Sequence, residues 1–445
     1  MGYLQMGKGG ELMAKHLVVV SVDALVFEDL EYAKTLPNFG KILSTGALVE
    51  RVTTIYPSLT HPVHASIMCG RPAGDTGVIA NTVFDMENGS GVWFNDFSQL
   101  KCETIFHAAK RAGLTTASCR WPLTENAGEV IDYLVPEVFG KVLTEYKNPA
   151  DAYRATGTSE CIMDIVQKAI DIYGAENDHP NYDEFEIYCS AEIIKRYKPN
   201  VLFTHPGQVD HIRHVTGVFS DEVKKAVELT DKWIGMLFEA LRDADIENET
   251  DFVVLSDHGQ LNIVRKMHPN TFLCDAGYID ADENGKITSW KAFAHSCSLS
   301  SQIYLSEPEN KELYDGVYAL LQRLAGEKIY GFEKVFTKDE VKEKYGLDGG
   351  FSFVIETDGY TSFAEDIKRP AVTDLDTSDY RFGKATHGHM PEKGPQPTFF
   401  GMGPSFKTGA CVKNCHVIDH ASTFAKMLGI DFPSGKGKAV TEILK

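Results

Sequence analysis

Two short apolar runs in this chain each lead into a carboxylate. Residues 17–22 precede Asp23, and residues 252–256 precede Asp257 and His258. Short runs rich in valine and leucine are typical of strands that are buried on both faces of a parallel sheet. Because ligands of such sheets collect at the carboxyl ends of the strands, the pattern predicts that Asp23, Asp257 and His258 meet at one sheet edge.

Two further segments carry the same types of residue. Asp210 and His214 follow the apolar residues 201–204, and His387 lies in a late His-Gly-His segment. A spacing of four residues places Asp210 and His214 on one face of a helix or turn. Taken alone, this pair also fits a capping aspartate and a surface histidine, and His387 also fits a polar loop.

Carboxylates and imidazoles gathered at one edge would repel one another or compete for protons unless a cation held them. We expect one metal ion bound by Asp210, His214 and His387, and a second bound by Asp23, Asp257 and His258. Each set offers N and O ligands and leaves a further position open, as catalytic zinc sites do. Two Zn²⁺ ions are therefore the expected cofactors, and Mn²⁺ or iron would suit the same donors.

Thr60 is the candidate nucleophile and also a candidate metal ligand. It lies in a loop just before a helix predicted over residues 63–69, and the free N–H groups of a helix start favour phosphate. A hydroxyl bound to zinc there would have a lowered pKa and could attack phosphorus. In the alternative, Thr60 is only an N-cap. Asn81 is the second candidate catalytic residue, because its amide could donate to a phosphate oxygen, although a turn asparagine is the alternative.

The length of the chain, 445 residues, favours one large domain with an insertion. The pattern of short apolar strands stops near residue 265 and returns near residue 385. We therefore expect residues 16–264 and 385–445 to form an α/β core, with a doubly wound, mostly parallel sheet flanked by helices. The resemblance given below implies that this core is alkaline phosphatase-like. Residues 265–384 are expected to form a smaller inserted α+β subdomain, and residues 1–15 a tail.

Charge and cysteine content restrict the partners. The formal net charge of −19 disfavours a nucleic-acid polymer or an anionic membrane as a partner, although metal ions could still attract a small anionic substrate. No apolar stretch is long enough for a transmembrane helix. The nine scattered cysteines are expected to be reduced thiols, which favours a cytoplasmic location. The pattern carries no prediction of the oligomeric state.

The ordered set of motifs resembles the alkaline phosphatase superfamily, and more closely its type I phosphodiesterase/nucleotide pyrophosphatase branch. The resemblance is carried by residues 22–24, 36–38, 56–64, 77–81, 120–122, 210–214, 256–259, 387–388 and 399–407. It implies the two zinc sites above, Thr60 as the covalent nucleophile and Asn81 as a donor to a phosphoryl oxygen. It also implies in-line attack on a small phosphodiester, including nucleotide pyrophosphates and phosphodiesters, through a phospho-threonine intermediate.

Some positions depart from the family pattern. His61 follows the nucleophile, where nucleotide pyrophosphatases usually carry a phenylalanine that helps to stack the base, so the nucleotide preference stays open. An alternative enzyme is a phosphonate or phosphomonoester hydrolase similar to phosphonoacetate hydrolase, and an alternative of another class is a non-catalytic metal-binding homologue. Candidate cations of the insertion for a substrate carboxylate or terminal phosphate are Lys291, Lys328, Lys368 and Arg369. Histidines expected to support the site or the fold are His64, His205, His211 and His268.

Overall fold

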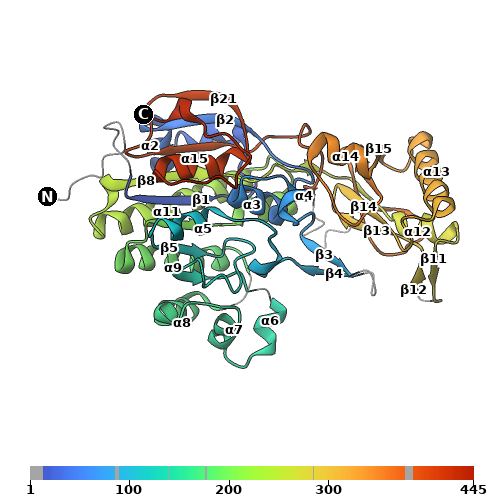
Figure 1. Ribbon diagram of the computed structural model, residues 1–445, viewed down its shortest axis with the longest axis horizontal. Coiled ribbons are helices and arrows are strands. Elements are labelled where there is room, and N and C mark those ends of the chain that lie inside the picture. Colours follow the sequence, from blue (N-terminus) through green and yellow to red (C-terminus); the bar gives the residue numbers. More distant parts are fainter. Residues whose placement is uncertain (1–13, 86–89, 139, 176–177, 284, 376–383) are drawn as a thin grey trace.

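An eight-stranded sheet forms the centre of the protein, in the order β21-β2-β20-β8-β1-β7-β5-β6 (Figure 1). The computed structural model describes residues 14–85, 90–138, 140–175, 178–283, 285–375 and 384–445, so most of the predicted tail lies outside the described residues. Along the sheet the strands are Cys411–His416, Ala47–Thr53, Phe399–Met402, Thr250–Leu255, His16–Ser21, Val201–Thr204, Thr116–Cys119 and Tyr133–Val135. β20 is antiparallel to both of its neighbours, and the other pairs are parallel.

Strand β1 lies inside the sheet and determines where the site forms. All of its residues are buried. Because successive side chains face opposite sides of a strand, Leu17 and Val19 join one apolar cluster, whereas Val18 and Val20 join the other. β1 pairs in parallel with both β7 and β8, so the carboxyl ends of these three strands meet at one edge of the sheet.

Helices cover both faces of this sheet (Figure 1). One apolar cluster includes residues of α3 (Thr60–Cys69), α5 (Ile105–Arg111) and α15 (Asp419–Leu428). The other includes residues of α2 (Pro37–Thr45), α8 (Met163–Tyr173), α9 (Asn181–Tyr197) and α11 (Asp221–Asp243). The predicted α/β fold, a mostly parallel sheet flanked by helices, is therefore confirmed.

Shorter elements complete this part of the chain. The helix α10 (Gln208–Thr216) follows β7, and strands β3 (Thr82–Asp85) and β4 (Ser90–Trp93) form an antiparallel pair. The remaining short helices are α1 (Leu30–Ala33), α4 (Ala73–Thr76), α6 (Gly140–Glu145) and α7 (Pro149–Ala155).

Residues 265–374, which we call the cap, form sheets of their own with a separate apolar cluster. In Figure 1 they lie to one side of the central sheet, in yellow and orange. A four-stranded antiparallel sheet consists of β13 (Ala292–Cys297), β14 (Ser300–Leu305), β16 (Phe353–Thr357) and β15 (Phe332–Thr337). A three-stranded sheet consists of β17 (Thr361–Phe363), β10 (Arg265–Met267) and β18 (Val372–Asp374). The other elements are β11 (Ile279–Ala281), β12 (Ile287–Trp290), α12 (Pro269–Asp275), α13 (Lys311–Glu327) and α14 (Lys338–Tyr345).

The two ends of the segment predicted to be an insertion lie side by side. Strand β9 (Leu261–Asn262) pairs antiparallel with β19 (Ala385–Thr386). The chain therefore leaves the core after β9 and returns at β19 next to its point of departure, which brings His387 back to the sheet edge.

Some local elements differ from the sequence-based expectation. The helix expected over residues 63–69 begins at Thr60, with Leu59 as its N-cap, so the interpretation of Thr60 as an N-cap was wrong. Pro62 permits the earlier start, because a first-turn residue has no intrahelical N–H bond to lose. Strand β21 was not predicted, since its sequence, Cys-Val-Lys-Asn-Cys-His, is polar and half exposed at the edge of the sheet.

All nine cysteines are free. Among the described residues, no helix combines the length and the apolar character that crossing a membrane requires.

A buried arginine links the segment after β1 to α10. Arg213 is fully buried, and its Nε donates to the carbonyl of Ala24 at 3.1 Å. Its guanidinium also forms an ion pair with the buried carboxylate of Asp29. Because α10 carries two predicted metal ligands and the segment after β1 begins with a third, this ion pair fixes their relative positions.

Replacing Arg213 with methionine should lower the free energy of unfolding by about 3–5 kcal/mol, because Asp29 would keep a buried charge without its partner. Urea unfolding followed by circular dichroism measures this. The control is Arg111→Met, whose guanidinium meets Glu103 at 2.8 Å on the surface and whose loss should change stability by less than about 1 kcal/mol. A loss for R213M no larger than that of the control would contradict the role of the buried pair.

Candidate active site

Residues from separate segments of the chain converge at the carboxyl edge of the sheet. A cavity of about 590 Å³ is lined by Thr60, Asn81, Asp210, His214 and His387 together with residues of the cap. The other predicted ligands, Asp23, Asp257 and His258, are buried at the same edge. The structure thus brings together all eight residues that were predicted for the site.

The carboxylates of Asp23 and Asp257 meet around the ring of His258. The Nε2 atom of His258 lies 3.2 Å from Asp257 Oδ2 and 3.7 Å from Asp23 Oδ1. Among the described residues, these two buried oxygens have no hydrogen-bond partner. Buried polar atoms without partners are costly, so this arrangement fits a bound cation.

His214 and His387 both face the carboxylate of Asp210. Their Nε2 atoms lie 3.2 Å from Asp210 Oδ2 and 3.8 Å from Asp210 Oδ1, respectively. The Nδ1 atom of His214 donates to the Ala385 carbonyl at 2.7 Å, and that of His387 donates to the Ser58 carbonyl at 3.2 Å. A proton on Nδ1 leaves the lone pair on Nε2, which is how metal-binding histidines are usually oriented.

His258 lies between the two sets of donors. Ligand atoms within 4.8 Å of one another form one group of Asp210, His258 and His387 and another of Asp23, Asp257 and His258. The rings of His258 and His387 stack with their centroids 3.9 Å apart. The assignment of His214, and not His258, to the ion at Asp210 stays a prediction.

Burial disfavours the charged form of both the aspartates and the histidines in this site. It raises the pKa of Asp23 well above its usual range, and the neighbouring carboxylates of Asp210 and Asp257 raise it further. Burial also raises the pKa of Asp257 and lowers the pKa of His258 to about 3. A bound divalent cation would reverse this for the carboxylates, because it favours their ionised form, and it would bind the neutral imidazoles directly.

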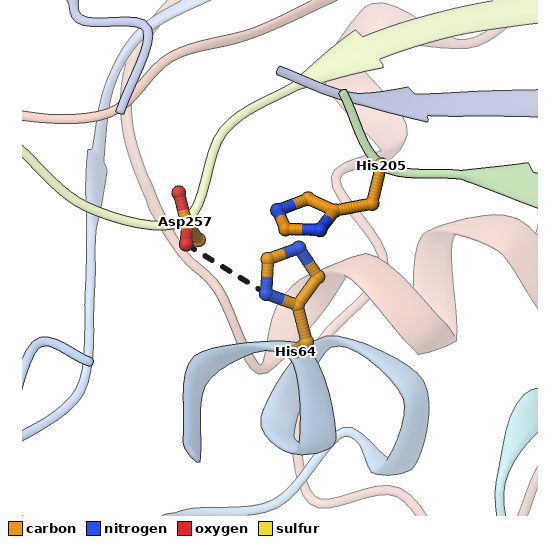
Figure 2. A group of neighbouring side chains, drawn as sticks. All are labelled: His64, His205 and Asp257. Carbon is orange, nitrogen blue, oxygen red and sulfur yellow. Dashed lines mark ion pairs between the residues drawn. The ribbon is translucent and has the colours of Figure 1, made fainter. Parts of the chain in front are cut away.

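A third group of donors lies beside α3, the helix that begins at Thr60. His64, His205 and Asp257 also place ligand atoms within 4.8 Å of one another, and Figure 2 shows the two rings next to each other beside the carboxylate. His64 Nδ1 donates to the Thr60 carbonyl at 2.7 Å, while its Nε2 accepts from the Ser21 hydroxyl at 2.9 Å. Both ring nitrogens are therefore in use, and His64 positions the first turn of α3.

Thr60 and Asn81 face the cavity from neighbouring segments. Thr60 Oγ1 lies 3.2 Å from His258 Nε2, next to both sets of donors. The Asn81 amide oxygen accepts from the backbone N–H of His61 at 3.0 Å, so the NH₂ group of Asn81 is left to donate to a ligand. With the His61 N–H occupied and Pro62 lacking one, the helix start offers an anion fewer free donors than the sequence analysis expected.

His61 does not line the cavity. It is buried, its Nε2 lies 3.7 Å from the carboxylate of Glu137, and its ring packs against Trp93 at a centroid distance of 5.0 Å. Burial lowers its pKa to about 3. Among the described residues, Trp93 is the one Trp, Tyr or Phe that lines the cavity, and the sequence carried no signal for it.

Comparison with known proteins identifies the family. A model of the family described as type I phosphodiesterase/nucleotide pyrophosphatase matches residues 17–388. The chain belongs to this family. Venom phosphodiesterase of Naja atra is 25% identical over 249 residues, which are 55% of this chain and 26% of that protein. Ectonucleotide pyrophosphatase/phosphodiesterase family member 3 of Rattus norvegicus is 24% identical over 257 residues, which are 55% of this chain and 24% of that protein.

These curated relatives are much longer, since the matched part of the chain spans about a quarter of their length. Among solved structures, murine ectonucleotide pyrophosphatase/phosphodiesterase 5 is similar, with a TM-score of 0.68 at 19% identity over 97% of this chain and 100% of that chain. An inactive threonine-to-alanine variant of that protein has been solved in complex with AMP. At this level of identity the likeness shows the fold.

The two roles of Asn81 can be separated by substitution. In Asn81→Asp the carboxylate still accepts from the His61 N–H but cannot donate to an anion. We expect the affinity of the zinc-loaded protein for inorganic phosphate to fall at least about tenfold, because a hydrogen bond to a charged group is worth about 1.5–3 kcal/mol. Isothermal titration calorimetry measures this affinity.

Asn81→Leu is the matched variant, since it removes both the donor and the acceptor. This variant alone should lose about 1–3 kcal/mol of stability, because the buried N–H of His61 loses its partner. Unchanged phosphate affinity in N81D would exclude Asn81 as a donor to the anion.

Proposed function

We propose that this protein is a metal-dependent hydrolase that cleaves phosphodiester bonds of small molecules. The observation that carries the proposal is the position of the Thr60 hydroxyl, which opens into the cavity and lies 3.2 Å from His258 within the cluster of carboxylates and imidazoles. Membership of the family and the AMP complex of a structural neighbour support it.

The donors fit two zinc ions. One set would be Asp23, Asp257 and His258, the other Asp210, His214 and His387, with Thr60 beside both. When bound, the ions supply Lewis acidity, which lowers the pKa of a coordinated hydroxyl and stabilises charge on the leaving oxygen. Mn²⁺ or iron could take the same donors.

The residues of the chain hold the reacting groups in place. Thr60 Oγ1 forms a bond to phosphorus while the bond between phosphorus and the leaving oxygen breaks, and water then hydrolyses the resulting phospho-threonine. The NH₂ group of Asn81 donates to a non-bridging oxygen. His64 holds the Thr60 carbonyl, so the first turn of α3 keeps its position during the transfer.

Hydrolysis of a phosphonate or phosphomonoester is the second candidate. The observation that favours it is the presence of two lysines, Lys266 and Lys368, in the wall of the same cavity. A panel of bis-p-nitrophenyl phosphate, p-nitrophenyl phosphate, p-nitrophenyl TMP and phosphonoacetate separates these reactions. Turnover of the diesters above the other two compounds supports the first candidate, and turnover of phosphonoacetate alone supports the second.

Thr60→Ala should reduce kcat on bis-p-nitrophenyl phosphate by at least about 10³-fold, because the nucleophile is lost. Thr60→Ser keeps a hydroxyl at the same place and should retain measurable turnover. Release of p-nitrophenol is followed at saturating substrate, and circular dichroism confirms that both variants are folded. Full activity of T60A would overturn the assignment of the nucleophile.

Zinc should stabilise the folded protein. Metal at about 1,000 times its Kd stabilises by about 4 kcal/mol per site, so chelation should lower Tm and abolish turnover, and zinc should restore both. Elemental analysis should give about two ions per chain for the wild type and fewer for Asp257→Asn and Asp210→Asn. His268→Asn is the control within the cavity, since both ring nitrogens of His268 are already hydrogen-bonded to Asp366 and Thr373. Unchanged metal content in both aspartate variants would contradict the site.

A further inference from the structure

Two lysines of the cap face the cavity that contains the candidate nucleophile. Lys266 belongs to β10, and Lys368 lies between β17 and β18; both line the same cavity as Thr60 and Asn81. We propose that Lys368, assisted by Lys266, binds a second anionic group of the substrate, either a carboxylate or a phosphate. The proposal rests on the proposed hydrolase function and adds a class of substrate, small molecules with an anionic group besides the phosphoryl group that Thr60 attacks.

Lys368 differs in its position from the other three candidate cations of the insertion. Arg369 forms an ion pair with Asp275 on the surface, and Lys328 lines a different hollow of the cap. Lys291 is exposed and is not among the residues that line the cavity. Of these four residues, Lys368 alone reaches the cavity.

The carboxylates on the cap wall contact neighbouring side chains. Glu365 Oε1 lies 2.6 Å from His295 Nδ1 and accepts from the Ser296 N–H at 2.8 Å. Asp366 meets His268 at 2.7 Å. These carboxylates are therefore held by partners other than Lys368.

Lys368 keeps its charge available for a ligand. Among the described residues, its ammonium group has no hydrogen-bond partner and no ion pair within 4.0 Å. The pKa of Asp366 is lowered mainly by its hydrogen bond to His268, and Lys368 contributes least among the causes. The remaining acidic residue of the wall, Asp374, lies in register with Arg265 on the neighbouring strand.

The backbone around Lys368 is fixed although its side chain is exposed. The Thr271 hydroxyl of α12 accepts from the Lys368 N–H and donates to the Lys368 carbonyl, both at 3.0 Å. Lys266 is fixed in the same way by its place in β10, opposite Thr373 in β18. Both ammonium groups thus extend from positioned backbone, which limits the freedom lost when they bind an anion.

An anion-binding wall has a clear physical use in this protein. The formal net charge of −19 disfavours the approach of a substrate that carries two negative groups, so local cations are needed at both ends of the ligand. Metal ions would supply the positive charge near Thr60, and the lysines supply it at the cap. An ammonium group is a compact charge with three donors and accepts carboxylate and phosphate alike.

Binding to the zinc-loaded protein tests this without turnover. The ligands are ω-phosphonocarboxylates with a graded series of methylene spacers, and the same compounds with a neutral carboxamide in place of the carboxylate. Titration calorimetry should show, for at least one spacer length, about tenfold tighter binding of the carboxylate than of the amide. A parallel series of α,ω-bisphosphonates shows whether the second group is preferred as a carboxylate or as a phosphate.

Substitutions test whether the lysines cause the preference for the carboxylate over the carboxamide. Lys368→Gln should bind carboxylate and amide equally and should bind the amide as the wild type does. Lys266→Gln should reduce the preference, and Lys291→Gln, which changes a cap lysine outside the cavity, should retain it. Absence of a preference at every spacer length in both series, or a preference that survives K368Q, would overturn the proposal.

Failure of this proposal and failure of the proposed function can be told apart. Lys291→Gln should hydrolyse bis-p-nitrophenyl phosphate at a rate within about twofold of the wild type, since Lys291 lies outside the cavity. If the wild type turned over none of the panel compounds, the hydrolase function would fall while the anion preference would still be measured by binding.

Discussion

Two buried carboxylates and a third that is partly exposed lie at one edge of the sheet, and they are the constraint on which the rest of this structure depends. Asp23 and Asp257 follow the adjacent parallel strands β1 and β8, and Asp210 lies on the helix after β7. Burial raises the pKa of Asp23 and Asp257, so without a cation the folded state disfavours their charges. The protein can keep these carboxylates ionised and buried only if something positive binds between them, and a metal site is the simplest arrangement that does so.

The imidazoles at this edge are oriented by the backbone. His214 and His387 each donate through Nδ1 to a carbonyl of a different segment, Ala385 and Ser58. Because the Nε2 atoms then face Asp210, the ligand geometry depends on how the chain returns to the core after the cap. The β9–β19 pair provides that return, so the long segment between these two strands is compatible with a precise site.

The sequence was sufficient for the parts of the site that follow buried strands. The apolar runs before Asp23 and Asp257 predict both the strand and the edge at which it ends, because short runs rich in valine and leucine are typical of strands buried on both faces of a parallel sheet. The sequence does not decide which set of donors includes His258, because its ring lies between both sets. Trp93 and Lys266 were missed because their strands are only four and three residues long, and only the tertiary arrangement places them in the cavity.

The residue after Thr60, His61, does not line the cavity. His61 is buried between Glu137 and Trp93, so it supports the β3–β4 hairpin and does not reach a ligand. In the proposed reaction, the surfaces that a substrate meets beyond its phosphoryl group would therefore come from that hairpin and from the cap, whereas the reacting groups would come from the sheet edge. Because these parts are separate in sequence, the cap and hairpin could change their side chains, and with them the substrate, while Thr60 and the carboxylates stay where the parallel strands place them.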